Sequence, residues 1–161
     1  MSKSRNIFIS HHGKDDRHVQ GLKERLTQQG YTIRNSSVDS TKHTDIRPSD
    51  RTIRQTLKSG ISWAGTFICI IGEKTHTRDW VNYEIKQAHL QGKRIVGVYK
   101  HGCRNDVKLP EAFEKYGGPP LGWNSLDKLI DVMNGKNIPS ENPDGSTRKP
   151  TYHITRVKCN R

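Results

Sequence analysis

The sequence lacks the features that mark membrane, secreted or disulfide-stabilised proteins. Hydrophobic residues make up 30% of the 161 residues and aromatic residues 7%, and no stretch approaches the ~18 consecutive apolar residues of a membrane span. The three cysteines show no C-x-x-C spacing, and the amino terminus runs into an apolar strand pattern without the apolar region of a signal peptide. These absences predict a cytoplasmic protein in a reducing compartment, with no membrane association.

Several nucleotide and metal motifs are also missing. Neither G-x-G-x-x-G nor G-x-x-x-x-G-K-[ST] occurs, which argues against Rossmann dinucleotide binding and P-loop chemistry. A phosphoacceptor domain would need an aspartate at the end of the third predicted strand, where residues 71–73 read Ile-Gly-Glu. His11, His12, His101 and Cys103 lack the spacing of a zinc site, so no metal is predicted.

Positive charge, by contrast, is abundant. The formal net charge is +12, and four of these charges belong to residues 134–161, which hold six Lys or Arg against two acids. No run in residues 1–133 exceeds two adjacent basic residues, and no helical pattern has a basic face interleaved with aromatics. Because the basic residues are scattered, nucleic acid is disfavoured as the main partner. The basic surface suits a small phosphate-bearing or dinucleotide ligand.

Short apolar segments alternate with helical patterns from residue 7 to residue 133. Strands are predicted at residues 7–10, 31–33, 66–72 and 95–98. Helices are predicted with apolar stripes at Val19, Leu22 and Leu26, at Ile53, Leu57 and Ile61, and at Val81, Ile85 and Ala88, with a turn at 111–115 and a last helix at 125–133. Gly30 and Gly92 are expected to end helices, and Gly60 and Gly65 to flank the entry into the third strand.

This alternation predicts an α/β fold: a flavodoxin-like doubly wound parallel sheet with helices on both faces. Residues 1–133 form the predicted domain, with a long polar loop near 35–47. Residues 134–161 form a polar, basic extension. Within it, apolar and polar residues alternate over 152–157, which predicts a late edge strand.

Residues 77–85 (TRDWVNYEI) are the most informative segment. Trp80 and Glu84 are four residues apart, on one side of a predicted helix that Asp79 can cap, directly after a buried strand. The carboxyl edge of a parallel sheet is where such folds bind ligands, so Glu84 is the first candidate for chemistry. The alternative is a core Trp80 with a solvated Glu84 paired to Lys86 or Arg78.

Taken in order, these segments resemble a TIR domain, and within that superfamily the TIR-like group that includes the ThsB component of bacterial Thoeris antiphage defence. The resemblance covers roughly residues 5–133. It rests on residues 7–12 with Asp15 and Asp16, and on residues 53–57, 67–72, 75–85 and 92–98.

The resemblance implies an enzyme that cleaves the bond between nicotinamide and ribose in NAD, which is its substrate rather than a cofactor. Glu84 is then the catalytic carboxylate, and the substrate-binding candidates are Ser10, His11, His12, Asp39 and Trp80. Arg34 and Lys42 are phosphate contacts or solvated bases. The resemblance also implies self-association, and an ADP-ribose-derived product read by a separate effector protein.

Two other functions fit the same fold. Many TIR domains act as non-catalytic association modules, and a nucleoside-processing transferase can use a glutamate on a similar sheet. Within these 161 residues no receptor or helical assembly segment is recognisable and the glutamate is kept, which favours the enzyme. The sequence names neither the product, the trigger, the oligomeric state nor the role of residues 134–161.

Overall fold

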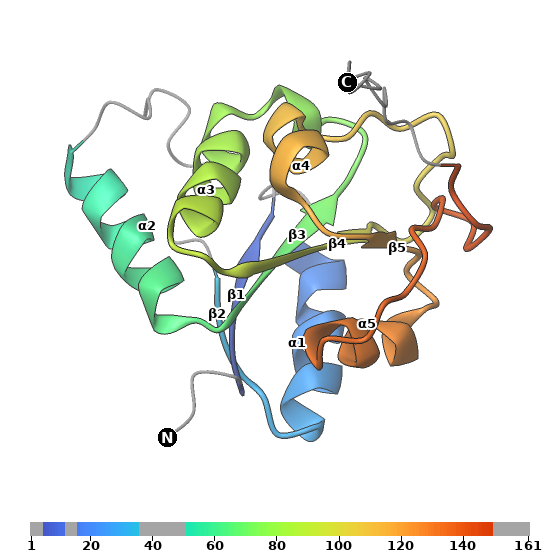
Figure 1. Ribbon diagram of the computed structural model, residues 1–161, viewed down its shortest axis with the longest axis horizontal. Coiled ribbons are helices and arrows are strands. Elements are labelled where there is room, and N and C mark those ends of the chain that lie inside the picture. Colours follow the sequence, from blue (N-terminus) through green and yellow to red (C-terminus); the bar gives the residue numbers. More distant parts are fainter. Residues whose placement is uncertain (1–4, 12–15, 36–50, 150–161) are drawn as a thin grey trace, which may run out of the picture.

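The architecture is a five-stranded parallel sheet covered by helices on both faces (Figure 1). A computed structural model describes residues 5–11, 16–35 and 51–149. The strand order is β2-β1-β3-β4-β5. The strands are β1 (Asn6–Ser10), β2 (Thr32–Asn35), β3 (Thr66–Ile71), β4 (Arg94–Tyr99) and β5 (Pro120–Leu121). This is the flavodoxin-like order, so the predicted fold class is confirmed.

The helices divide between the two faces of the sheet (Figure 1). They are α1 (Asp16–Gln28), α2 (Arg51–Trp63), α3 (Asp79–Leu90), α4 (Glu111–Tyr116) and α5 (Leu126–Met133), with a 3-10 turn, η3 (Thr75–Thr77), before α3. One apolar cluster joins the sheet to α2, α3 and α4, and a second joins it to α1 and α5. Within the described ranges, no helix combines the length and the apolar character needed to cross a membrane.

The alternation of side chains along β1 and β3 sends them to the two clusters in turn. Phe8 and Phe67 are partners in the β1–β3 register and stack at 5.7 Å between ring centroids on the α2 and α3 face. Ile9 and Ile68 belong to the opposite cluster. Because both faces of these strands are buried, their sequences read as continuous apolar runs, which is why the strands were predictable.

Two helix endings follow their predicted glycines. Gly30 and Gly92 have φ angles of +90° and +69°, the left-handed conformation that glycine adopts at low cost. After α1, Tyr31 N–H donates to Leu26 C=O, and after α3, Lys93 N–H donates to Ala88 C=O. Both bonds close Schellman-type ends and satisfy carbonyls that the helix leaves open.

Two other boundary predictions are wrong. Asp79 does not cap α3: the helix begins at Asp79, and the preceding Arg78 takes the extended capping conformation without a side-chain hydrogen bond. The carboxylate still lies at the positive end of the helix dipole. Gly60 lies inside α2, whose buried face continues through Ile61 as predicted, so of the two glycines only Gly65 lies between α2 and β3.

The fifth strand was not predicted, and it joins the sheet to part of the extension. β5 pairs with β4, supported by the hydrogen bond from Gly118 N–H to Ile95 C=O. Glu141 N–H donates to Pro120 C=O, and its carboxylate accepts from Gly122 N–H and from Lys128 Nζ. Residues 134–149 are therefore packed against the domain, whereas the edge strand expected at 152–157 lies outside the described residues.

Candidate functional site

A carboxylate and a hydroxyl meet over the sheet near the carboxyl end of β1. Ser10, the last residue of β1, donates a 3.3 Å hydrogen bond from Oγ to Glu84 Oε1 on α3. Both residues are buried, with Glu84 1% exposed and Ser10 0%. The pairing joins residues 74 positions apart in the sequence. The structure thus brings together two of the residues predicted for the site.

The position of Glu84 follows from the way the chain leaves β3. Gly72 N–H donates a 2.8 Å hydrogen bond to Thr75 Oγ1, which turns the chain into η3 and then into α3. The helix packs on the sheet through Val81, Ile85 and Ala88. Glu84 shares this buried side, so the alternative of a solvated Glu84 is wrong.

A buried, uncharged cysteine side chain lies close to Glu84. Cys69 in β3 is the register partner of Ser10 and is completely buried. Burial, together with the nearby Glu84 carboxylate, raises the pKa of the Cys69 thiol far above its usual range. The thiol therefore stays protonated at physiological pH. A carboxylate beside this buried, uncharged thiol interacts more strongly with a positive charge than one in water would.

Trp80 lies one helical turn before Glu84. It is half-buried, packs against the cluster under α2, α3 and α4, and makes an edge-to-face contact with Tyr83 at 5.7 Å. Burial raises the pKa of the Tyr83 hydroxyl, and the charge of Arg54 partly opposes that shift. Trp80 therefore packs against the core without being buried in it, and its contact with a substrate remains a prediction.

The other predicted contacts are only partly covered by the described residues. His11 follows Ser10 directly and is half-buried. His12, Asp39 and Lys42 lie outside the described ranges. Among residues 5–11, 16–35 and 51–149, no three His, Cys, Asp or Glu side chains form a group that could hold a metal ion.

Cys69 is the neighbour of Glu84 that the sequence did not reveal. Its place in a buried strand was predicted, but its position beside Ser10 depends on the β1–β3 register, which sets Ser10 opposite Cys69. No local motif carries that register, since it pairs segments separated by a helix, a strand and a second helix.

The sheet order, the helices on both faces and the buried glutamate on the helix after β3 define a flavodoxin-like domain of the TIR type. A family model described as the TIR-like domain of the Thoeris protein ThsB matches residues 8–105. The chain belongs to this family, which is part of Thoeris antiphage defence.

The solved structures that the chain is similar to include TIR domains. The TIR domain of the Toll-related receptor TRR-2 from Hydra magnipapillata is 12% identical over 80% of this chain and 98% of its own, with a TM-score of 0.53. The TIR domains of the activated Roq1 resistosome, which recognises the effector XopQ, are 16% identical over 83% of this chain and 86% of their own, with a TM-score of 0.47. At this identity, the likeness to the TRR-2 domain concerns the fold alone. No curated protein sequence matches the chain significantly.

Proposed function

We propose that this chain cleaves the bond between nicotinamide and ribose in NAD, with Glu84 as the catalytic carboxylate. The observation that carries the proposal is the placement of Glu84. In a TIR-like domain of the ThsB family, the carboxylate lies buried on α3, hydrogen-bonded to the residue that ends β1. A costly buried charge at the ligand-binding edge of the fold is the kind of group that an active site retains.

The reaction suits a single carboxylate. The nicotinamide ring of NAD is already cationic, so it leaves with the electron pair of the glycosidic bond as a neutral molecule, and no general acid is needed. Positive charge develops on the ribose as an oxocarbenium-like centre, which the Glu84 carboxylate stabilises. Water then gives ADP-ribose and a proton, or another hydroxyl or nitrogen nucleophile gives an ADP-ribose derivative.

Neighbouring residues have separate roles in this proposal. Ser10 fixes one oxygen of Glu84 through its hydroxyl. Trp80, half-buried one turn earlier, offers an aromatic surface for the nicotinamide ring, and His11 borders the same edge. His12 and Asp39 are proposed as further substrate contacts on the basis of the family resemblance.

The first prediction concerns Glu84→Gln. The substitution keeps the size of the side chain and removes its charge, so nicotinamide release should fall by at least about 100-fold. Because a buried charge is removed, the melting temperature should stay unchanged or rise. Nicotinamide is measured by chromatography of the activated protein, with circular dichroism as the check on folding.

Glu73→Gln is the matched control, since Glu73 is an exposed glutamate eleven residues earlier. It should leave nicotinamide release unchanged. A folded Glu84→Gln variant that releases nicotinamide at the wild-type rate would remove Glu84 from the mechanism and favour the association module.

The second prediction concerns the product. A site that holds the ribosyl intermediate away from water favours transfer over hydrolysis, and the surroundings of Glu84 are buried. We therefore expect an ADP-ribose derivative, read by a separate effector, as the main product. Mass spectrometry of infected cells that carry the gene should detect it. Finding ADP-ribose and nicotinamide alone, with defence that needs no partner gene, would instead point to NAD depletion.

A further inference from the structure

The helices α2 and α3 lie side by side on one face of the sheet, and both begin at the edge where the strands end (Figure 1). Two hydrogen bonds join them toward their carboxyl ends. Gln91 Nε2 donates to Lys58 C=O, and Lys93 Nζ donates to Ser62 C=O. These bonds show which flank of each helix faces the other.

The same bonds place Arg54 opposite Tyr83. Residues four apart share one flank of a helix, so Arg54, Lys58 and Ser62 all face α3. Tyr83 precedes Gln91 by two turns and faces α2 in the same way. A helix carbonyl points toward the residue four positions on, so Lys58 C=O lies at the level of Ser62, eight residues after Arg54. Gln91 is also eight residues after Tyr83, which puts Arg54 and Tyr83 at one level between the two helices.

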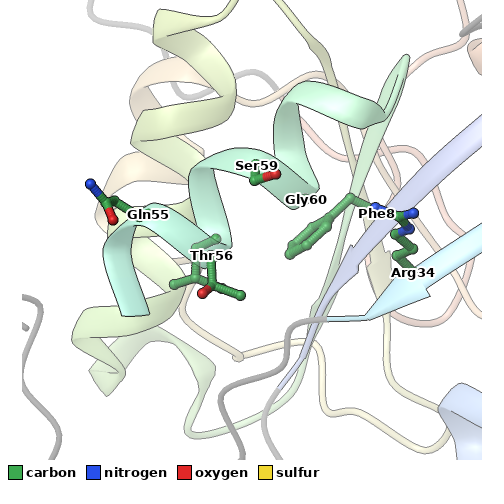
Figure 2. A pocket seen from close by; sticks show the side chains of 7 residues that line it. Phe8, Arg34, Gln55, Thr56, Ser59 and Gly60 are labelled. Atoms are coloured by element: carbon green, nitrogen blue, oxygen red, sulfur yellow. The ribbon is translucent and has the colours of Figure 1, made fainter. Parts of the chain in front are cut away.

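The opposite flank of α2 faces β1 and β2, as Figure 2 shows for Thr56 and Gly60. A Cβ at Gly60 would lie 2.9 Å from Phe8 Cε2. The cavity on this flank is lined by Phe8, Arg34 and residues of α2, and Arg54 is not among them. Arg54 therefore belongs to the flank that meets α3.

Arg54 and Tyr83 offer hydrogen-bond donors between the two helices. Arg54 is half-buried, and its guanidinium has five N–H donors in a planar fork that matches a phosphate group. The Tyr83 hydroxyl is buried and has no hydrogen-bond partner among the described residues. Burial raises the pKa of this hydroxyl, and the charge of Arg54 only partly opposes the shift, so the group stays protonated at physiological pH.

A buried hydroxyl without a partner costs free energy, and an acceptor on a ligand would remove that cost. The charge of the surroundings indicates which kind of acceptor. Three of the thirteen residues of α2 are basic and none is acidic. The flank that carries Arg54 therefore favours an anionic group over a cationic one.

Tyr83 is connected to the candidate catalytic site through Trp80. The two rings meet edge to face at 5.7 Å, and Glu84 lies one turn after Trp80, on the side toward the sheet. Going round α3, Trp80 thus lies between Glu84 and Tyr83. In NAD, one ribose separates the nicotinamide bond from the pyrophosphate. A substrate that is cleaved at Glu84 can therefore extend its pyrophosphate past Trp80 toward Arg54.

We propose that Arg54 binds the pyrophosphate of the dinucleotide substrate, with the Tyr83 hydroxyl as a second donor to the same group. This inference rests on the proposed function, because it names the residues that hold the substrate of that site. Arg54 and Tyr83 set the affinity and the preference for a phosphate-bearing substrate, whereas Glu84 acts on the bond that breaks.

The first test measures NAD binding by calorimetry, with the full chain carrying Glu84→Gln so that NAD stays intact. Adding Arg54→Leu should weaken binding by at least about 30-fold, because more than one charged hydrogen bond is lost. Adding Tyr83→Phe should weaken it by about tenfold, the effect of one hydrogen bond to a charged group. The controls are Lys58→Leu, which removes a charge one turn later on α2, and Tyr116→Phe on α4, and both should bind NAD as the parent does.

The second test compares NAD with nicotinamide riboside, which carries no phosphate, in protein that keeps Glu84. Arg54→Leu should lower kcat/KM for nicotinamide release from NAD by at least about 30-fold and leave the value for the riboside unchanged. A variant that folds poorly would lose both activities equally. Arg54→Lys keeps the charge without the planar fork, so its effect on NAD should be smaller than that of Arg54→Leu.

Stability provides a further check on Tyr83. Tyr83→Phe should keep or raise the melting temperature, because it removes a buried hydroxyl that has no partner in the described part of the chain. The inference is overturned if NAD does not bind, if it binds as tightly after Arg54→Leu, or if the two substrates lose activity equally. Protein that binds NAD through Arg54 but releases no nicotinamide would instead overturn the proposed function.

Discussion

Glu84 is a carboxylate with 1% of its surface exposed, and this burial carries a cost. A charge removed from water is retained only where partners or function compensate for it. The Ser10 hydroxyl offsets part of the cost through a 3.3 Å hydrogen bond. The same burial keeps a dinucleotide from reaching the carboxylate until neighbouring atoms move, so the resting protein is expected to be inactive.

The third prediction concerns Ser10→Ala. Losing the hydroxyl leaves Glu84 Oε1 without the hydrogen bond that orients it, so kcat for nicotinamide release should fall about tenfold, as expected for one hydrogen bond to a charged group. KM should change less, because the effect acts through Glu84 rather than on substrate binding. Steady-state kinetics of the activated protein measures both constants.

Ser62→Ala is the control for this prediction, since Ser62 is exposed on α2. It should behave as wild type. A Ser10→Ala variant with normal kcat would show that the contact with Glu84 is structural only.

The residues of the candidate site were predictable where short sequence patterns identify them. Trp80 and Glu84 are one turn apart on a helix that the apolar stripe predicts, and Ser10 ends a recognisable strand. The contact between Ser10 and Glu84, and the place of Cys69 beside them, depend on the strand register and on how α3 packs on the sheet. A single sequence does not encode these distances in any local pattern.

At the scale of helices and strands, predictions succeeded for strands that are buried along most of their length. They failed where contacts with other segments determine whether a strand forms. β1, β3 and β4 each lie between two other strands and are mostly buried, so their apolar runs were visible. β5 has two residues and begins with a proline, which no apolar run or alternation could reveal. It forms because Gly118 and Glu141 hold it against its neighbours.

Glu141 is the residue that attaches the extension to the domain. Its side chain is 4% exposed, and its ion pair with Lys128 Nζ spans 2.7 Å. Burial raises the pKa of its carboxyl, but hydrogen bonds from Lys128, Ser125 and Gly122 N–H outweigh burial and leave the pKa below its usual value. The folded state therefore favours the charged form of Glu141.

The fourth prediction concerns Glu141→Gln. The free energy of unfolding should fall by about 1–3 kcal/mol at pH 7, the cost of losing charged hydrogen bonds in a buried place. Because the pKa is lowered in the folded state, the contribution is complete above the ordinary carboxyl pKa of about 4.3 and is lost as pH falls through the lowered value. Urea unfolding at pH 7 and in acid measures the difference.

Wild type and Glu141→Gln should thus differ at pH 7 and converge in acid. Glu111→Gln is the control, because Glu111 forms an exposed pair with Lys115 on one helix. That variant should change stability by no more than about 0.5 kcal/mol. A Glu141→Gln variant as stable as wild type at pH 7 would contradict the role given to this carboxylate.

At the scale of the whole molecule, activity is expected to depend on self-association, which is the fifth prediction. A buried Glu84 needs a rearrangement that contacts between neighbouring subunits can supply. Specific nicotinamide release should therefore rise with protein concentration and fall on dilution. Light scattering and activity are measured on the same samples. Full activity in a demonstrably monomeric sample, unaffected by dilution, would overturn the prediction.

The covering of β5 limits the geometry of any such assembly. The outward Pro120 C=O and Gly122 N–H are both occupied by Glu141, so this side of the sheet offers no template for another strand. Among the described strands, β2 is the other edge. A chain of subunits joined strand to strand needs two open edges, so pairing through β2 stops at a two-fold dimer. Within the described part of the chain, longer filaments must therefore use contacts other than strand pairing.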